Sequence, residues 1–381
     1  MKVMDIVMYP IRTAVVPIEN GGIAPYRGSR DSGAGTTSAT SALYKVTTDD
    51  GIIGWGEMNM ILTLKLTNAL LDEVIRPAVI GQDPFDINRI KTRVDSLYNP
   101  DINMLHFISG VEMALWDIMG KATKKPVHVL LGGAVRSCAP IAYAMGMMDD
   151  GQLAEKMAQL REEGYATIKT KGGNDVLEDI HRTHMLRTLA GDEMDIRVDM
   201  NQGYDMTQAV AYVGAVEDCR LQYVEQPLRC NDLMDYAVLR QRCRVPVAIN
   251  EDCYIPGGLF NAIRNCAVDA AVVDMESIGG ISELVKLAHI AQAANLPLAH
   301  HCAWDMGIKT AAIVQTVCAL EALKLPIDST YHAHAEDPLA KPIVTRNGAY
   351  VLPEGPGLGI EVDEQKVLHM LDEDHTTRYV F

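Results

Sequence analysis

The sequence of 381 residues contains no apolar run as long as the roughly 18 residues that a membrane-spanning helix needs. Positive charge is also scarce, because 34 Lys and Arg residues face 50 Asp and Glu residues, for a formal net charge of −16. A surface this acidic repels phosphate backbones and anionic lipids, so we expect neither a nucleic-acid nor a membrane partner. The N-terminal segment lacks the basic start and the unbroken apolar stretch of a secretory signal, and we therefore expect a cytoplasmic protein.

Motifs that would mark a disulfide framework or a nucleotide site are missing too. The cysteines include no C-x-x-C pair, which favours small buried side chains over disulfides. No G-x-G-x-x-G follows a predicted strand, and the Gly-rich stretch Gly28–Gly35 carries no G-K-[ST], so neither a dinucleotide fold nor a phosphate loop is expected. Hydrophobic residues at 48% and charged residues at 22% indicate an ordinary globular chain.

The first third of the chain combines strand-like and helical patterns. A strand-like segment covers Val3–Val16, and the Asp49-Asp50-Gly51 turn joins two further strands into a hairpin. Apolar residues at three- and four-residue spacing then predict helices. This order of elements predicts an α+β domain. The hairpin strands are expected at Ala42–Thr47 and Ile52–Glu57, and the helices at Thr63–Ile75, Asp86–Leu97 and Phe107–Thr123.

From about Ser137 onward, short apolar runs alternate with amphipathic helices. Such repetition builds a parallel sheet, and seven clear units with a less distinct eighth strand near Leu325–Thr330 favour a closed barrel over an open sheet. We therefore predict a modified TIM barrel of the type (β/α)7β. The clear strands are expected at Ile141–Met145, Thr167–Lys169, Ile196–Val198, Gln222–Val224, Val247–Ile249, Ala270–Val273 and Pro297–Ala299.

Charged or titratable residues stand at the ends of six successive predicted strands. A barrel of this kind carries its active site at the carboxyl ends of its strands, so these residues are expected to face one another. Side chains two apart on a strand also point the same way, which places the two lysines together. The residues are, in chain order, Lys169 and Lys171, Asp199 with Asn201, Glu225, Glu251, Asp274, and His300 with His301.

The acids at the third, fourth and fifth strand ends form a candidate metal site. Three converging carboxylates repel one another unless a cation lies among them. Mg²⁺ takes carboxylate oxygens together with water and substrate oxygens, so Asp199, Glu225 and Glu251 are candidate ligands. For each acid taken alone, the alternative is that it caps the helix that follows its strand.

The lysines and histidines beside these acids suit the removal of a proton α to a carboxylate. The resulting enediolate carries two negative charges, which a metal ion and ammonium groups can stabilise. Lys171 is a candidate base on one face, and His301 oriented by Asp274 is a candidate on the other. Lys169 is expected to stay charged and neutralise the carboxylate. A K-x-K pair in isolation could instead be a solvated strand end.

These residues resemble the motifs of the enolase superfamily, specifically its mandelate racemase subgroup, and the resemblance covers nearly the whole chain. Its members use a lysine or histidine base together with Mg²⁺. The motifs are GIIGWGE at Gly51–Glu57, ALWDIMG at Ala114–Gly120, LLGG at Leu130–Gly133, K-T-K at Lys169–Lys171, D-M-N at Asp199–Asn201, E-Q-P at Glu225–Pro227, Gly279-Gly280 after Asp274, and PGLG at Pro356–Gly359.

The resemblance implies a division of the chain and roles for its residues. Residues 1–126 would form a capping domain, 127–353 the barrel, and 354–381 a segment returning to the cap. Asp199, Glu225 and Glu251 would bind Mg²⁺, while Lys171 and the Asp274–His301 pair would act as the two acid/base catalysts. Relatives of the muconate-lactonising kind place a lysine at the sixth strand, where this chain has Asp274. An even homo-oligomer is also implied.

Several positions stay open at this level. His300 competes with His301 for the role of base, and the interval from Asp274 favours His301. Many relatives carry a glutamate at the eighth strand, whereas this chain offers Asp328, Thr330 or Glu321. His332 and His334 are expected in a surface loop.

Substrate contacts outside the acid/base set are predicted from the chain's polar loops. Asn201 and Thr330 are candidates at the strand ends. The Gly-rich stretch before the second predicted strand suits a lid, from which Arg27 and Arg30 could meet a polar or anionic part of the substrate.

The expected activity is therefore Mg²⁺-dependent abstraction of the proton α to a carboxylate of a small molecule, through an enediolate. Loss of a β-hydroxyl would make the protein a lyase that dehydrates a sugar acid or related hydroxy acid, and this outcome is favoured by analogy with the subgroup. Reprotonation on the other face would make it a racemase or epimerase, and a cycloisomerase is a further alternative. A non-catalytic binding homologue is the alternative of another class.

Overall fold

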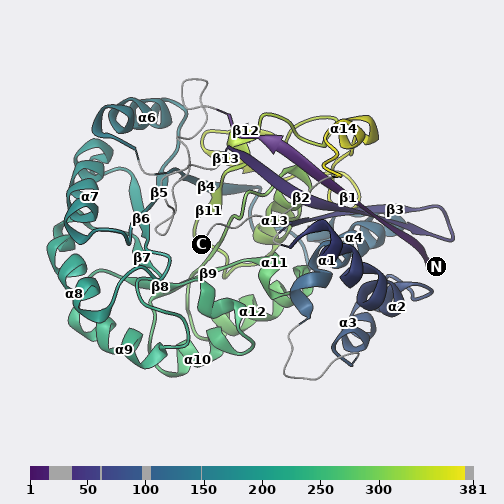
Figure 1. Cartoon of the computed structure of the whole chain (residues 1–381), viewed down its shortest axis with the longest axis horizontal. Helices are drawn as coiled ribbons and strands as arrows, with labels where there is room; N and C mark the ends of the chain where they lie inside the picture. Colours follow the sequence, from purple (N-terminus) through teal and green to yellow (C-terminus); the bar gives the residue numbers. More distant parts are fainter. Residues whose placement is uncertain (17–36, 61, 97–103, 147, 374–381) are drawn as a thin grey trace.

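The computed structural model describes residues 1–16, 37–60, 62–96, 104–146 and 148–373. An antiparallel sheet of β1 (Val3–Ala14), β2 (Ser38–Thr48) and β3 (Ile53–Asn59) lies beside a barrel of parallel strands, with the sheet on the right of Figure 1 and the barrel on the left. The β2–β3 hairpin turns at Gly51, whose φ of 79° is a left-handed conformation that glycine adopts without strain.

Helix α4 (Leu105–Thr123) packs directly on β3 because glycines line the contact. A Cβ atom on Gly54 would lie 2.1 Å from the carbonyl oxygen of Ala114, and one on Gly56 would lie 1.8 Å from that of Gly110. The G-x-G pattern of the hairpin is therefore a requirement of backbone-to-backbone packing. The other helices of this part are α1 (Leu64–Leu70), the π-helical turn η2 (Leu71–Ile75), α2 (Arg76–Val79), α3 (Ile87–Ser96) and α5 (Val127–Leu130).

Strands β4 to β11 form the barrel, and helices follow the first seven of them (Figure 1). Strand β11 pairs in parallel with β4, and the N–H of Leu325 donates to the carbonyl of Leu298 at 3.1 Å, which closes the ring beside β10. The strands are β4 (Cys138–Ala144), β5 (Thr167–Lys171), β6 (Asp195–Asp199), β7 (Tyr223–Glu225), β8 (Val247–Ile249), β9 (Ala270–Val273), β10 (Leu298–His300) and β11 (Ile327–Ser329). The helices are α6 (Asp150–Glu162), α7 (Val176–Ala190), α8 (Met206–Ala215), α9 (Leu233–Arg242), α10 (Gly258–Arg264), the short α11 (Met275–Ile278), α12 (Ile281–Ala293) and α13 (Gly307–Ala319).

The inside of the barrel is filled by its own apolar cluster. Tyr223, Val272 and Ala299 belong to this cluster, which is separate from the larger core between strands and outer helices. Because side chains alternate along a strand, residues two positions further on point inward as well. Asp274 follows Val272 at this interval and His301 follows Ala299, so both face the barrel axis at its carboxyl end.

Buried acids of the cap hold it to the barrel by accepting hydrogen bonds from helix N-termini. Glu57 of β3 accepts from the N–H groups of Met306 and Lys309, at 2.6 and 2.9 Å, at the start of α13. Glu112 of α4 accepts from the first two N–H groups of α12, at 2.8 and 2.9 Å. Helix N-termini present unpaired N–H groups, so these carboxyl groups stabilise both the helices and the interface by accepting hydrogen bonds from them.

The C-terminal part runs back toward the cap. A hairpin of β12 (Thr345–Arg346) and β13 (Ala349–Val351) pairs antiparallel with β4, and α14 (Glu364–His369) follows. The N–H of Arg12 in β1 donates to the carbonyl of Met370 at 2.9 Å. The domain boundaries at 126/127 and 353/354 stay a prediction.

The predicted fold, a modified (β/α)7β barrel with an α+β cap, is confirmed. The sequence pattern did not reveal helix α13, because every one of its residues is buried and no polar face marks its period. The short β12–β13 hairpin was missed as well. None of the described helices is long and apolar enough to cross a lipid bilayer.

Candidate active site

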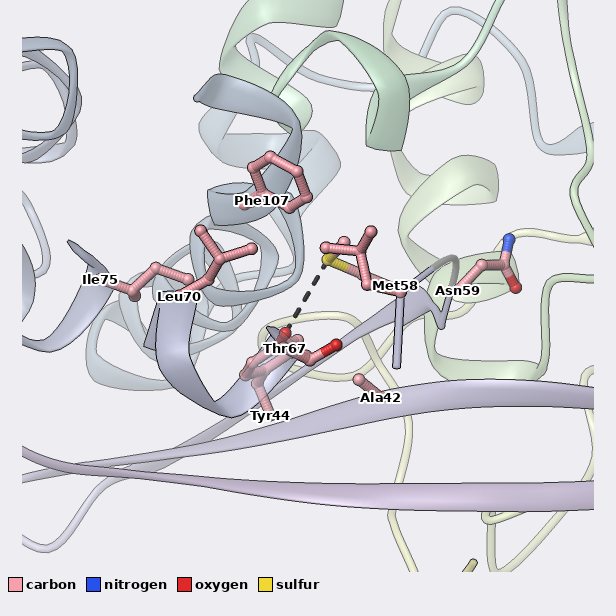
Figure 2. Close-up of a pocket in the computed structure, with 9 residues that line it drawn as sticks. Ala42, Tyr44, Met58, Asn59, Thr67, Leu70, Ile75 and Phe107 are labelled. Atoms are coloured by element: carbon pink, nitrogen blue, oxygen red, sulfur yellow. Dashed lines mark hydrogen bonds between the residues drawn. The ribbon is translucent and has the colours of Figure 1, made fainter. Parts of the chain in front are cut away.

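The cap contains a pocket between its sheet and its helices (Figure 2). It is lined by side chains from β2, β3, α1, η2 and α4, among them Ala42, Leu70 and Phe107, and the hydroxyl of Tyr44 donates to the sulfur of Met58 at 3.8 Å. The lining holds no carboxylate, histidine or lysine. Such a surface can pack apolar groups but offers no acid or base, so the chemistry must lie elsewhere.

The carboxyl ends of the barrel strands gather charge around a buried lysine. The Nζ atom of Lys169 lies 2.7 Å from an oxygen of Glu225, 2.7 Å from one of Asp328 and 3.3 Å from one of Asp199. Lys169 is only 4% exposed. Its ammonium group is therefore fixed among three carboxylates from three other strands, and a solvated strand end does not describe it.

Lys171 and Asn201 extend this network toward Glu251. The Nζ atom of Lys171 lies 2.7 Å from Asp199 Oδ2 and 2.6 Å from Asn201 Oδ1. The amide nitrogen of the Asn201 side chain in turn donates to Glu251 at 3.4 Å. Asn201 has a φ of 42°, a left-handed conformation that asparagine tolerates better than most residues. The predicted strand-end residues of β5, β6, β7 and β8 thus form one continuous group.

The three candidate ligands carry more negative charge than their surroundings neutralise. Burial alone would raise the pKa of Asp199, but Lys171 and Lys169 hold it below the ordinary value. Burial and repulsion from Asp199 raise the pKa of Glu225 well above its ordinary range, and the same two causes raise that of Glu251. Glu251 Oε2 is buried without a hydrogen-bond partner. A set of buried carboxylate oxygens in this electrostatic conflict fits a hard dication such as Mg²⁺.

The two adjacent histidines have different surroundings. His301 Nδ1 lies 3.4 Å from Asp274 Oδ2, on the inward face of the barrel. Both ring nitrogens of His300 are engaged by backbone instead: Nε2 accepts from the N–H of Met275 at 3.1 Å, and Nδ1 lies 2.5 Å from the carbonyl oxygen of His301. His300 is completely buried. The geometry therefore favours His301 as the group available to a substrate.

Lys309 of α13 is a part of the site that the sequence did not reveal. This fully buried lysine lies 3.3 Å from Asp274 Oδ1 and 2.7 Å from oxygens of both Glu276 and Asp305. Burial would raise the pKa of Asp274, but Lys309 and His301 hold it well below its usual range. A charged residue inside an otherwise apolar stretch was the one signal that could have identified it.

The acid of the eighth strand, Asp328 in β11, forms ion pairs with two buried cationic side chains. Asp328 accepts from Lys169 and, at 2.9 Å, from Arg197, whose guanidinium lies 4.9 Å from the centre of the Tyr223 ring. This carboxylate is thus already engaged by two cations. Thr330 stands two residues further on and is buried.

Other predicted positions fall away from the site or outside the described residues. Glu321 is excluded as a substrate ligand, because it is exposed and lies before the amino end of β11, where its carboxylate accepts from Gln292. His332 and His334, expected in a surface loop, are half-buried, and His332 lies in the 3₁₀ turn η5 (Tyr331–Ala333). His332 stacks on Tyr143 with ring centres 3.9 Å apart, and His334 packs edge-on against Trp304. Arg27 and Arg30 lie outside the described residues.

Comparison with known proteins gives consistent matches. Residues 14–132 match the mandelate racemase / muconate lactonizing enzyme N-terminal domain, and residues 152–366 match the enolase C-terminal domain-like family. The D-galactarolactone cycloisomerase of Agrobacterium fabrum is 30% identical over 342 residues, which cover 84% of this chain and 88% of the relative. The arabinonate dehydratase of Saccharolobus solfataricus is 28% identical, covering 84% and 87%. The solved structure of N-succinyl Arg/Lys racemase from Bacillus cereus superposes with a TM-score of 0.89 at 25% identity, covering 97% of this chain and 98% of that one.

Proposed function

The chain belongs to the enolase superfamily, in its mandelate racemase subgroup, and from this premise we propose that it removes the proton next to the carboxylate of a small substrate. The observation that carries the proposal is that each of two candidate bases contacts a buried acid at the carboxyl ends of the barrel strands. Lys171 at the end of β5 contacts Asp199, and His301, which follows directly after β10, contacts Asp274. A binding protein has no need of a base on each side of a carboxylate site.

The chain's own residues account for the proton transfer. His301 Nδ1 is directed at Asp274, which leaves Nε2 to face the substrate as acid or base. Lys171 Nζ would exchange a proton on the opposite face, and Lys169 would keep its positive charge beside the carboxylate. Asp199, Glu225 and Glu251 would hold Mg²⁺. When bound, the ion supplies positive charge that lowers the energy of the enediolate dianion.

We further propose that the protein is a lyase that dehydrates a sugar acid or a related hydroxy acid. The arabinonate dehydratase among its relatives is named for a reaction of this class. With a base on one face and an imidazolium on the other, the site can remove the α-proton and protonate a departing β-hydroxyl. Racemisation is the second candidate, because Lys171 and His301 on opposite faces of the substrate could also invert the α-carbon, and the N-succinyl Arg/Lys racemase shares the fold.

The test follows hydrogen exchange and elimination together. The protein, loaded with Mg²⁺, is incubated in deuterated water with a library of mono- and diacid sugars and N-acylated amino acids. Deuterium at the α-carbon is followed by mass spectrometry and NMR. Loss of water with formation of a keto acid identifies a dehydratase, and inversion without loss of water identifies a racemase or epimerase. Chelation of the metal is expected to stop both.

Matched variants separate the chemistry from general damage. The double variant Lys171→Met, His301→Asn should lose exchange entirely. His181→Asn changes an exposed histidine on α7 and should leave exchange as in the wild type. If no acid in the library exchanges its α-proton with the intact protein, a non-catalytic homologue becomes the better description.

A further inference from the structure

A second group of potential metal ligands lies on the outer layer of the barrel. His184 projects from α7, while Asp218 and Cys219 belong to the 3₁₀ turn η3 (Glu217–Cys219) that leads from α8 into β7. This turn precedes the amino end of β7, whereas the candidate active site lies at the carboxyl ends of the strands. The group therefore has no part in the proposed reaction.

The spacing of the three side chains matches a tetrahedral metal site. One ligand atom from each residue lies within 4.8 Å of the others, with His184 Nδ1 3.3 Å from Cys219 Sγ and Cys219 Sγ 3.9 Å from Asp218 Oδ1. Zinc bonds of about 2.3 Å to sulfur and about 2.0–2.1 Å to nitrogen or oxygen, at tetrahedral angles, separate neighbouring ligand atoms by about 3.5 Å. The two distances fall on either side of that value, so small side-chain adjustments suffice.

The imidazole of His184 is oriented as a ligand requires. Its Nε2 atom lies 3.0 Å from the carbonyl oxygen of Ala215 at the end of α8. Since a carbonyl can only accept, Nε2 carries the hydrogen and Nδ1 keeps its lone pair, directed at Cys219. An outer N–H held by a backbone carbonyl is the arrangement that fixes metal-binding histidines in position.

From these contacts we propose that His184, Asp218 and Cys219 form a structural site for a thiolate-binding divalent cation such as Zn²⁺. A thiolate, a carboxylate and a neutral imidazole together carry two negative charges, which a dication balances. Water would complete the coordination. Thiolate ligands select zinc-like metals, while carboxylates suit Mg²⁺, so the two sites of the molecule would discriminate between metals by ligand chemistry.

The surrounding charges define how the ion would bind. Burial and the neighbouring Asp218 raise the pKa of the Cys219 thiol to about 11, so binding must release a proton at neutral pH. Arg187, which donates to the carbonyl of Cys219 at 2.7 Å, opposes this by favouring the thiolate. Arg220 next in the chain pairs with Asp192. The ion would link α7 to the turn before β7 and so stabilise this part of the barrel.

The test uses Co²⁺ as a spectroscopic probe of thiolate binding. Protein saturated with Mg²⁺ is titrated with Co²⁺, and absorption from thiolate-to-Co²⁺ charge transfer is recorded in the near ultraviolet. We expect the band to saturate at one equivalent, to disappear in Cys219→Ser, and to persist in Cys266→Ser, which changes an exposed cysteine. Zn²⁺ should displace the cobalt.

Variants of the other two proposed ligands test the metal site independently of Cys219→Ser. His184→Ala and Asp218→Asn alter a partly exposed and an exposed side chain, so folding should be retained, as circular dichroism can verify. Loss of an outer-shell partner lowers metal affinity by roughly 10- to 100-fold. Each ligand variant should weaken Co²⁺ binding by at least this much. The proposal is overturned if the wild type shows no thiolate band, if the band survives in Cys219→Ser, or if both ligand variants bind Co²⁺ as tightly as the wild type.

Discussion

The lysine side and the histidine side of the candidate active site are each built around a buried ammonium group, but they are attached to different parts of the molecule. On the lysine side, Lys169 contacts acids of β6, β7 and β11, all of them barrel strands. On the histidine side, Lys309 neutralises Asp274, and its own backbone N–H is held by Glu57 of the cap.

A second contact also joins the histidine side of the site to the cap. Glu276, which pairs with Lys309, accepts a hydrogen bond at 3.1 Å from the backbone N–H of Asn59 at the end of β3. Among the described residues, Lys169 on the lysine side contacts acids of barrel strands, whereas Lys309 and Glu276 on the histidine side also contact β3 of the cap. Disturbing the cap should impair proton transfer on the histidine face first.

The largest expected effect is on the rate of α-proton exchange, measured separately for the Lys171 face and the His301 face of the substrate. Lys171→Met should lower α-proton exchange by about 10²–10⁴-fold for substrates whose proton faces the lysine, because a positioned general base contributes about that much. His301→Asn should do the same for the opposite configuration. The measurement is deuterium incorporation into each of two enantiomeric or epimeric acids. If either variant abolishes exchange of both configurations equally, the two-sided assignment fails.

A smaller effect is expected from Lys309→Met, which leaves three acids buried without their common cation. Removing one partner from a buried ion pair typically costs about 3–5 kcal/mol, so urea unfolding should show a loss of this size. In the folded fraction, exchange on the histidine face should fall while exchange on the lysine face is kept. Lys286→Met, which removes an exposed lysine paired with Glu283, is the control and should cost less than about 1 kcal/mol.

Equal loss on both faces in Lys309→Met would show that the two sides are one cooperative unit. Asp305→Asn offers a milder change, because it removes one acid but leaves the contact between Lys309 and Asp274. Its effect on exchange should be smaller than that of Lys309→Met and confined to the same face.

The same contrast explains what the sequence could and could not predict. Strand alternation and the position of an active site at strand ends suffice to bring Lys169, Lys171 and Asp199 together, and the structure places them in contact. Their catalytic roles stay a prediction. Lys309 and Glu57 could not be predicted, because Lys309 lies in a helix without a polar face and their other partners, apart from the nearby Asp305, come from elements far apart in the chain.

Local sequence patterns also did not show how tertiary packing half-buries two histidines that line a pocket. His332 and His334 follow a strand end and alternate like loop residues, so they were expected at the surface. In the structure, burial lowers their pKa values to about 3 and about 4, and both rings pack on aromatic side chains. Nothing local in the sequence shows that Tyr143 and Trp304 would cover them.

The smallest expected effect concerns the acid that joins the cap to the histidine side. Burial raises the pKa of Glu57 from 4.5 to about 8. Between these values the folded state holds a proton that the unfolded state has lost, so the stability contributed by Glu57 is present at low pH and is lost as the pH rises through the window. The free energy of unfolding of the wild type, relative to Glu57→Gln, should therefore fall by up to about 1.4 kcal/mol per pH unit.

Urea unfolding of both proteins across this pH window measures the difference, and Glu155→Gln, at an exposed position of α6, gives the background. The glutamine also loses one of the two acceptor oxygens that face Met306 and Lys309, which lowers stability by a constant amount at every pH. A difference that does not vary with pH would mean that Glu57 is charged throughout. In that case its two hydrogen bonds from α13 outweigh burial, and the cap would hold the histidine side equally firmly at every pH in the window.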